Sequence, residues 1–156
     1  MNKYAFIVLG VARSGTSALA GCLSHLGVEF GQGLKPVDWQ NPKGNFENKA
    51  LSQANQRLLA LLGSNWSDHK SLPEGWRSFA DVSKEDGIIE NIIRKVFSEH
   101  SPIGLKDPRL VPLLPLYMDL LKRLGYIPVL ISTTRNKHEV IESIGKSGYY
   151  HGEYSP

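Results

Sequence analysis

The amino-acid sequence predicts an α/β fold with a short parallel sheet flanked by helices. Apolar runs with the length of strands alternate along the chain with segments that repeat apolar residues at helical spacing. This alternation is typical of parallel sheets, because parallel strands are joined by helical crossovers. We expect one domain over residues 1–156, since no linker or repeat interrupts the pattern.

Composition excludes several classes of protein. Hydrophobic residues make up 41% and charged residues 21% of the chain, which is the balance of a globular domain rather than a disordered one. The formal net charge of +3 is small and scattered, so we expect no nucleic-acid partner. Cys22 is the one cysteine and excludes an internal disulfide; with no signal peptide or membrane-spanning run, we expect a cytoplasmic protein without membrane binding.

The first predicted strand and helix are separated by a glycine-containing loop. Residues 4–9 form a nearly continuous apolar run that ends at Gly10, which predicts a central parallel strand buried on both faces. After residues 11–15, apolar side chains recur at helical spacing, and Gly27 supplies a stop signal. A polar stretch over residues 31–48 follows, and its length predicts a functional loop.

The alternation continues to the last helix. Apolar spacing predicts helices over 51–62, 88–97 and 113–124, with an irregular stretch over 64–83. Short apolar runs predict buried strands over 103–106 and 127–133. Asn136 is a suitable N-cap for a final helix through Ile144, and Glu139 completes an approximate capping box there.

Residues 10–17 carry the strongest functional signal. Their sequence, GVARSGTS, joins a buried strand to a helix, so backbone N–H groups and the positive helix end converge on one anionic group. The spacing of Gly10 and Gly15 is similar to that of the nucleotide-binding P-loop and predicts a three-layer P-loop NTPase-like domain. A tight turn without a ligand is the alternative.

The loop lacks the parts that ATP hydrolysis needs. Thr16 replaces the P-loop lysine, the basic residue is Arg13, and the strand over 127–132 contains no acidic residue to help hold Mg²⁺. We therefore expect an anionic ligand that is bound without a metal.

Two separate motifs resemble those of the PAPS-dependent sulfotransferases. The run from Arg13 to Ser17, RSGTS, looks like the loop that binds the 5′-phosphosulfate of 3′-phosphoadenosine 5′-phosphosulfate (PAPS). Arg135 at a predicted strand end, followed eight residues later by Ser143, resembles the motif that binds the 3′-phosphate. Residues 41–48 (NPKGNFEN) and 105–109 (LKDPR) are similar to segments of bacterial and protein-tyrosine members.

The resemblance implies an enzyme that uses PAPS as sulfuryl donor and releases 3′-phosphoadenosine 5′-phosphate (PAP). It implies that Glu47 is the general base and that Lys106 and Arg13 stabilise the charge on the leaving group. It further implies that the cofactor is bound by Arg13, Ser14, Gly15, Thr16, Ser17, Arg135 and Ser143. The acceptor would be a hydroxyl or amine of a small molecule, sugar or peptide.

Two observations on the residues agree with this interpretation. Both basic motifs follow predicted parallel strands, and open α/β sheets bind ligands at the carboxyl ends of their strands. A sulfuryl group carries less charge than a phosphoryl group, so Arg13, Lys106 and the loop amides suffice without Mg²⁺.

Several residues have alternative roles. Asp107 is the alternative base, or else it stabilises the loop at Pro108. Glu47 alternatively lies in the first turn of the second helix, where the helix dipole favours a carboxylate. We expect Arg109 to pair with an acidic neighbour. We expect His138 to be exposed in the first turn of the last helix; contact with the ligand, beside the 3′-phosphate motif, is the alternative.

The remaining histidines and the tryptophans carry weaker signals. We expect the other histidines to be surface or structural residues; they are His25, His69, His100 and His151. Trp39, Trp66 and Trp76 lie in or near the irregular stretches, where tryptophan lines an acceptor pocket, stacks on adenine or packs in the core.

The end of the chain departs from the family pattern. Family members usually continue well beyond the 3′-phosphate helix, so we expect this chain to lack the usual C-terminal part and to expose apolar surface that favours homo-oligomers. Two other functions stay open: a P-loop nucleotide kinase with a diverged loop, and a truncated non-catalytic module that binds PAP or PAPS.

Overall fold

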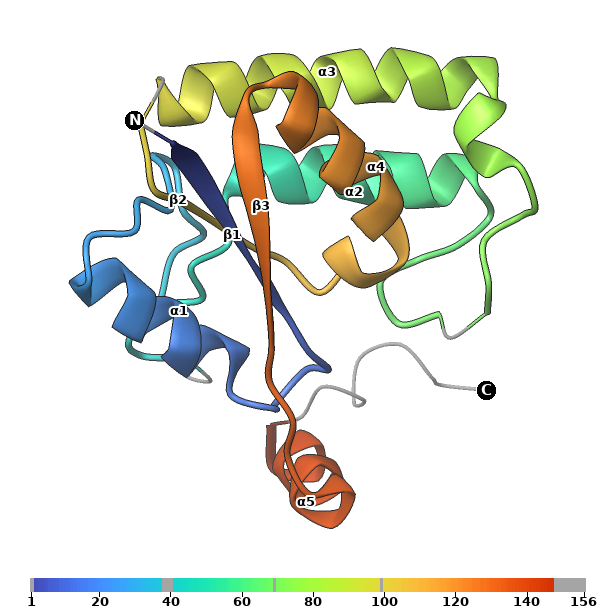
Figure 1. Ribbon diagram of the computed structural model, residues 1–156. Coiled ribbons are helices and arrows are strands. Elements are labelled where there is room, and N and C mark those ends of the chain that lie inside the picture. Colours follow the sequence, from blue (N-terminus) through green and yellow to red (C-terminus); the bar gives the residue numbers. More distant parts are fainter. Residues whose placement is uncertain (1, 38–40, 69, 99, 148–156) are drawn as a thin grey trace.

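Three strands form a parallel sheet in the order β2-β1-β3 (Figure 1). The computed structural model describes residues 2–37, 41–68, 70–98 and 100–147. The strands are β1 (Lys3–Leu9), β2 (Ile103–Lys106) and β3 (Tyr126–Ser132). The prediction of a short parallel sheet with β1 at its centre is confirmed.

Helices cover both faces of this sheet, which confirms the α/β prediction. Within the described ranges there are five α-helices and one short 3₁₀ helix, η1 (Trp76–Ser78). The α-helices are α1 (Thr16–His25), α2 (Lys49–Leu61), α3 (Ala80–Phe97), α4 (Leu110–Arg123) and α5 (Lys137–Ser147). None of the described helices is long and apolar enough to cross a membrane.

Side chains of β1 alternate between two hydrophobic cores, as the pleat of a strand requires. Ala5 and Ile7 point into the larger core, which β1 shares with α2, α3 and α4. Phe6 points to the opposite face, where it packs with Val28 and Phe30 against α1. The central strand is therefore covered on both faces, as its apolar run predicts.

The carboxyl ends of all three strands meet at one end of the molecule. Val8 lies opposite Lys106 of β2 and Ile131 of β3, so the strands finish almost level. Because β1 has a neighbour on each side, the loops after the strands diverge at this end, where open α/β sheets form their ligand crevices. In Figure 1, α5 also lies beyond this end of the sheet.

The structure corrects the prediction that β3 is a buried strand. The side chains of Ile127 and Leu130 are 43% and 47% exposed. In the part of the chain that the structure describes, β3 pairs with β1 alone, and α1 packs against β1 and β2 rather than over β3. An apolar run at a sheet edge has the same local sequence as one at its centre, so the pattern does not separate the two.

Two helices begin earlier than their apolar patterns predict. α3 begins at Ala80, in a stretch predicted to be irregular, because its first two turns bury only Val82 and Glu85 and give little apolar repeat. α4 begins at Leu110, before Pro112, whose missing N–H costs nothing in the first turn of a helix.

The start of α5 is as predicted in one respect and different in another. The side chain of Asn136 accepts a hydrogen bond from the His138 amide at 2.9 Å, which confirms the N-cap. The predicted capping box is wrong, because the Glu139 carboxylate accepts a hydrogen bond from Arg135 Nε at 2.8 Å instead. The charge of the guanidinium outcompetes the neutral amide of the N-cap residue.

Candidate functional site

The loop after β1 is held in place by hydroxyl groups. The hydroxyl of Ser14 lies 2.7 Å from the carbonyl of Val11, to which it donates. It also lies 2.7 Å from Thr133 Oγ1, and either of these two hydroxyls can be the donor. The Thr133 amide in turn donates to the Leu9 carbonyl at 2.9 Å, which extends the β1–β3 pairing beyond the strands. The side chain of Ser14, predicted to bind the ligand, is thus buried and used to shape the loop.

The amino terminus of α1 is open to a ligand. Its N-cap is Gly15, in the left-handed conformation with φ 98°, and no side chain caps the helix. The first amides of a helix have no acceptor within the helix, and the helix dipole places positive charge there. Gly15, Thr16, Ser17 and Ala18 all line the pocket described next, so the amino terminus of the helix borders it.

A pocket of about 220 Å³ lies at the carboxyl end of the sheet. It joins the α1 amino terminus to the segment before α2, the end of β2 and the end of β3. Its polar and charged lining residues include Arg13, Thr16, Ser17, Asn41, Asn45, Glu47, Lys106, Asp107 and Arg135. Seven of the nine residues predicted to form one site therefore line one cavity; Ser14 and Ser143 do not line it.

The two basic motifs contact each other, although they are far apart in the chain. Arg13 Nε donates to Ser143 Oγ of α5 at 3.0 Å, and Arg135 Nη1 donates to the Arg13 carbonyl at 3.3 Å. Arg13 itself has a positive φ of 67°, a conformation that non-glycine residues adopt rarely. Both motifs thus meet at Arg13, at the mouth of the loop.

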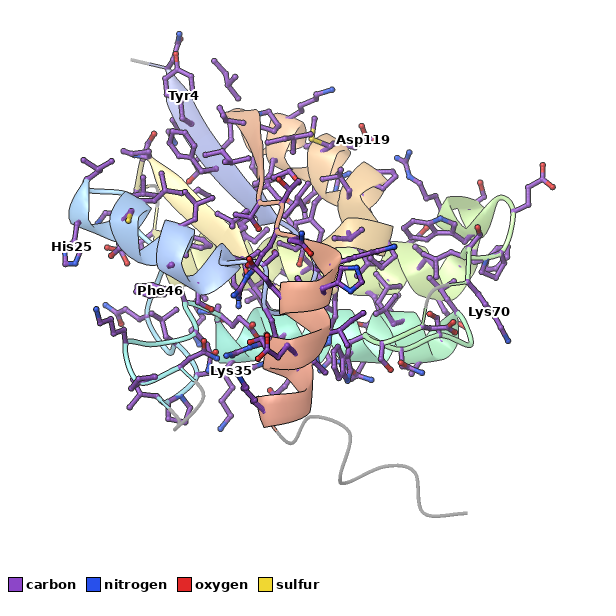
Figure 2. The ribbon with its side chains drawn as sticks, turned by 90° about the horizontal axis from the view of Figure 1, so that it is seen from below. Tyr4, His25, Lys35, Phe46, Lys70 and Asp119 are labelled. Atoms are coloured by element: carbon purple, nitrogen blue, oxygen red, sulfur yellow. The ribbon has the colours of Figure 1, made fainter. Side chains whose placement is uncertain are left out.

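Glu47 lies between two lysines. Its Oε1 is 2.6 Å from Lys106 Nζ and its Oε2 is 2.6 Å from Lys35 Nζ. The side chains of Glu47 and Lys106 are only 10% and 8% exposed. Figure 2 shows Lys35 near the beginning of α2. The result is a nearly buried carboxylate with both oxygens paired.

The position of Glu47 excludes the helical alternative for this residue. The N-cap of α2 is Asn48, whose side chain accepts from the amides of Ala50 and Leu51, so Glu47 precedes the helix. Phe46, with φ 55°, packs edge-on against Phe30 with ring centroids 5.6 Å apart. This anchor directs Phe46 into the small core, while Glu47 lines the pocket.

Asp107 is the centre of a buried hydrogen-bond network. Its Oδ2 accepts from Ser52 Oγ at 2.7 Å, and its Oδ1 accepts from the amide and the guanidinium of Arg109 at 2.9 and 3.0 Å. The expected pairing of Arg109 and the predicted loop-stabilising role of Asp107 are both present. Both oxygens of Asp107 are engaged by groups that stabilise the fold, whereas one of the two partners of Glu47 is Lys106, the predicted leaving-group lysine.

The network continues to Tyr117 of α4. Its hydroxyl donates to Asn55 Oδ1 at 2.7 Å, and Asn55 Nδ2 lies 3.5 Å from Asp107 Oδ2. Burial raises the pKa of Tyr117 well above its usual range, and the negative charge of Asp107 adds to the rise. Tyr117 is therefore a neutral hydrogen-bond donor that links α4 to α2 beneath the pocket.

An apolar groove of about 460 Å³ adjoins the pocket. The two cavities share Trp66, Pro108 and Arg135 among their lining residues. Val111 of α4 and Ile141 of α5 also line the groove and are 53% and 65% exposed. The groove thus extends the charged pocket towards an exposed apolar surface between α4 and α5.

The other candidate residues divide into exposed, packed and undescribed ones. His25, His100 and His138 are exposed, as predicted. Trp66 lines both cavities, whereas Trp76 packs against the larger core. Trp39, His69 and His151 lie outside the described residues. No group of three or more His, Cys, Asp or Glu side chains suited to a metal ion occurs within the described ranges.

Sequence reasoning missed Lys35 and Thr133. Lys35 lies in a polar loop without a motif, and only its backbone pairing with Glu47 brings it to the site. Thr133 directly follows β3 and precedes Arg135 by two residues, so a hydroxyl at a strand end was the available signal.

Comparison with known proteins shows no family for this chain. No protein-family model, no curated protein and no solved structure matches the chain.

Proposed function

We propose that this chain is a PAPS-dependent sulfotransferase with a P-loop NTPase-like fold. One observation carries the proposal: Glu47 and Lys106 are paired in a pocket that is also lined by an uncapped helix terminus, Arg13 and Arg135. A carboxylate suits removal of a proton, a lysine suits a leaving-group charge, and the remaining groups suit phosphates.

The lining residues fit a donor with two separated phosphates. The open amides at the start of α1 would hold the 5′-phosphosulfate, because they supply donors and positive potential without a side-chain cap that competes. Arg135 would hold the 3′-phosphate, because it is a cation that lines the pocket, and Ser143 would assist it from α5, where its hydroxyl accepts from Arg13 Nε. Ser14 contributes to loop shape instead of contacting the ligand through its hydroxyl.

In the proposed reaction Glu47 accepts the proton of the acceptor hydroxyl or amine. A bond forms between the acceptor atom and sulfur as the bond from sulfur to the 5′-phosphate oxygen breaks, and its electron pair stays on the phosphate. Lys106 and Arg13 stabilise that charge together with the amides of α1. This assignment needs no metal ligand.

The acceptor is proposed to reach the pocket through the adjoining apolar groove. The shared residues Trp66 and Pro108 connect the groove to the end of β2, which carries Lys106. A small molecule, a sugar face or a peptide side chain is compatible with such a groove, because binding sites combine apolar walls with a few polar groups, here including Asp68 and Lys137.

A thermal-shift titration tests the donor class. A ligand at about a hundred times its dissociation constant stabilises the native state by roughly 2.7 kcal/mol, so binding is easily detected. We expect a shift with PAP and none with ATP plus Mg²⁺. A shift with Mg-ATP alone would support a nucleotide kinase, and PAP binding without transfer to a broad acceptor panel would support a non-catalytic module.

A second measurement tests the assignment of the 3′-phosphate motif. Arg135→Ala should weaken the binding of PAP much more than the binding of adenosine 5′-phosphosulfate. Only PAP has the 3′-phosphate that Arg135 would bind. Lys146→Ala, which removes an exposed cation of α5 that does not line the pocket, is the matched control and should change neither affinity. Equal losses for the two ligands would contradict the assignment.

A further inference from the structure

We infer that Lys35 is a positioning residue that holds Glu47 and thereby frees Lys106 to contact the donor. The inference rests on the proposed function, in which Lys106 stabilises the charge on the 5′-phosphate. It assigns separate tasks to the two oxygens of Glu47: Oε2 stays with Lys35, and Oε1 is released by Lys106 and receives the proton.

The geometry of the three side chains supports this division. Each lysine contacts a different oxygen of Glu47 at 2.6 Å. Lys106 is 8% exposed, lies at the end of β2 and lines the pocket. Lys35 is 32% exposed and approaches the carboxylate from the loop that precedes α2. The lysine at the pocket and the lysine at the loop thus hold different oxygens of one carboxylate.

The backbone around Lys35 is built to keep it there. Its amide donates to the Glu47 carbonyl at 2.7 Å, and the Lys49 amide donates to the Gly33 carbonyl at 3.0 Å. These bonds flank an antiparallel bridge between Leu34 and Asn48. The Asn48 side chain, besides capping α2, donates to the Gln32 carbonyl at 2.7 Å. Lys35 is therefore tied to the residue that it pairs with, whereas Lys106 belongs to another element.

The need for a second cation follows from burial. Glu47 is nearly buried, and a buried carboxylate that loses its partner carries a large desolvation penalty. If Lys106 were its only partner, every donor that recruits Lys106 would leave Glu47 unpaired. Lys35 removes that penalty, because one ion pair remains when Lys106 turns to the phosphate.

During transfer the two oxygens then have different tasks. The acceptor O–H proton moves to Oε1 while the acceptor oxygen bonds to sulfur, and the sulfur–oxygen bond to the 5′-phosphate breaks with its electron pair on the phosphate. Lys106 Nζ donates a hydrogen bond to that phosphate oxygen. Lys35 makes no contact with donor or acceptor in this scheme and acts through Glu47 alone.

A double-mutant cycle on PAP binding, measured by calorimetry, tests the inference without knowledge of the acceptor. Lys35→Met should weaken the binding of PAP about tenfold when Glu47 is present. A change of this size is typical when one of two coupled charged neighbours is removed. In a Glu47→Gln background the same substitution should cost less than about twofold, because no buried charge is left unpaired. Lys106→Met gives a second background in which the effect of Lys35 should also vanish, because no lysine then leaves Glu47 for the donor.

Two controls distinguish a positioning role of Lys35 from the general effect of removing a positive charge. Lys35→Arg should restore most of the PAP affinity, since a guanidinium also pairs with Oε2. Lys43→Met removes an exposed lysine from the same polar loop and should have the same small effect in both backgrounds. Melting temperatures show that each variant is folded.

The outcomes distinguish the inference from the proposed function. An equal loss of affinity from Lys35→Met in the wild-type and the Glu47→Gln backgrounds overturns the positioning role and leaves the sulfotransferase proposal intact. A wild-type protein that does not bind PAP overturns the proposed function, and the role of Lys35 falls with it.

Discussion

Gly10 is the residue on which the loop conformation depends most closely. Its φ is 150°, and a Cβ atom there would lie 2.4 Å from Thr133 Oγ1 and 2.7 Å from Ser14 Oγ. Those two hydroxyls join the loop to the end of β3. A side chain at residue 10 would therefore separate the loop from the strand that leads to Arg135.

Gly10→Ala should lower the free energy of unfolding by about 1–3 kcal/mol, the usual cost of overpacking. Gly87→Ala is the matched control, because Gly87 lies within α3 and has nothing within 4 Å of an added Cβ. That substitution should stabilise the protein by roughly 0.5–1 kcal/mol through the higher helix propensity of alanine. Urea denaturation measures both, and an unchanged midpoint for Gly10→Ala would refute the steric argument.

At the scale of elements, the Asp107 network joins α2, α4 and the end of β2. Ser52 and Asn55 come from α2, Tyr117 from α4 and Asp107 from the residue after β2. Lys106 immediately precedes Asp107, so the network fixes the backbone that carries the proposed leaving-group lysine. The buried hydrogen bonds thus connect helix packing to site geometry.

Tyr117→Phe should destabilise the protein by about 1–3 kcal/mol, because Asn55 Oδ1 is left buried without its donor. For a chain of this size, each kcal/mol lowers the melting temperature by about 2–4 °C. Tyr4→Phe removes a hydroxyl from a side chain that is 39% exposed and should have little effect. Equal melting temperatures for Tyr117→Phe and the wild type would show that the network does not stabilise the fold.

At the scale of the whole molecule, α5 buries little apolar surface and makes polar contacts at the site. Val140 is the buried side chain of this helix among its described residues. The polar contacts of α5 with the site include the Arg13–Ser143 hydrogen bond and the link from Arg135, just before α5, to the Arg13 carbonyl. A helix with so little buried surface opens at low free-energy cost, so its order depends on its contacts with the loop over residues 10–17.

Ser143→Ala should raise the hydrogen-exchange rate of α5 amides about three- to tenfold, because one net hydrogen bond contributes about 0.5–1.5 kcal/mol. Ser24→Ala, an exposed position on α1, is the control and should leave α5 unchanged. If the proposed function is right, PAP slows α5 exchange in the wild type by bridging Arg13 and Arg135. Exchange that is identical in wild type and Ser143→Ala would show that this contact does not hold the helix.

Patterns of neighbouring residues predicted most of the helices and strands. The wrong predictions concern features that depend on tertiary packing. The apolar run of β1, the stop at Gly27 and the N-cap Asn136 are properties of neighbouring residues, and the structure has all three. The early start of α3 and the exposure of β3 depend on what packs against them. Local sequence does not contain that information.

The sequence by itself determined the order of strands and helices, the glycine loop and the positions of Arg13, Lys106 and Arg135 at the carboxyl end of the sheet. Only the tertiary structure decided which charges meet. Lys35 and Lys106 pair with one Glu47 carboxylate, and Arg13 contacts Ser143 across 130 positions of the chain. Ion pairs and hydrogen bonds are short-ranged, so they depend on how packed elements bring distant residues together, and that placement follows from the fold of the whole chain.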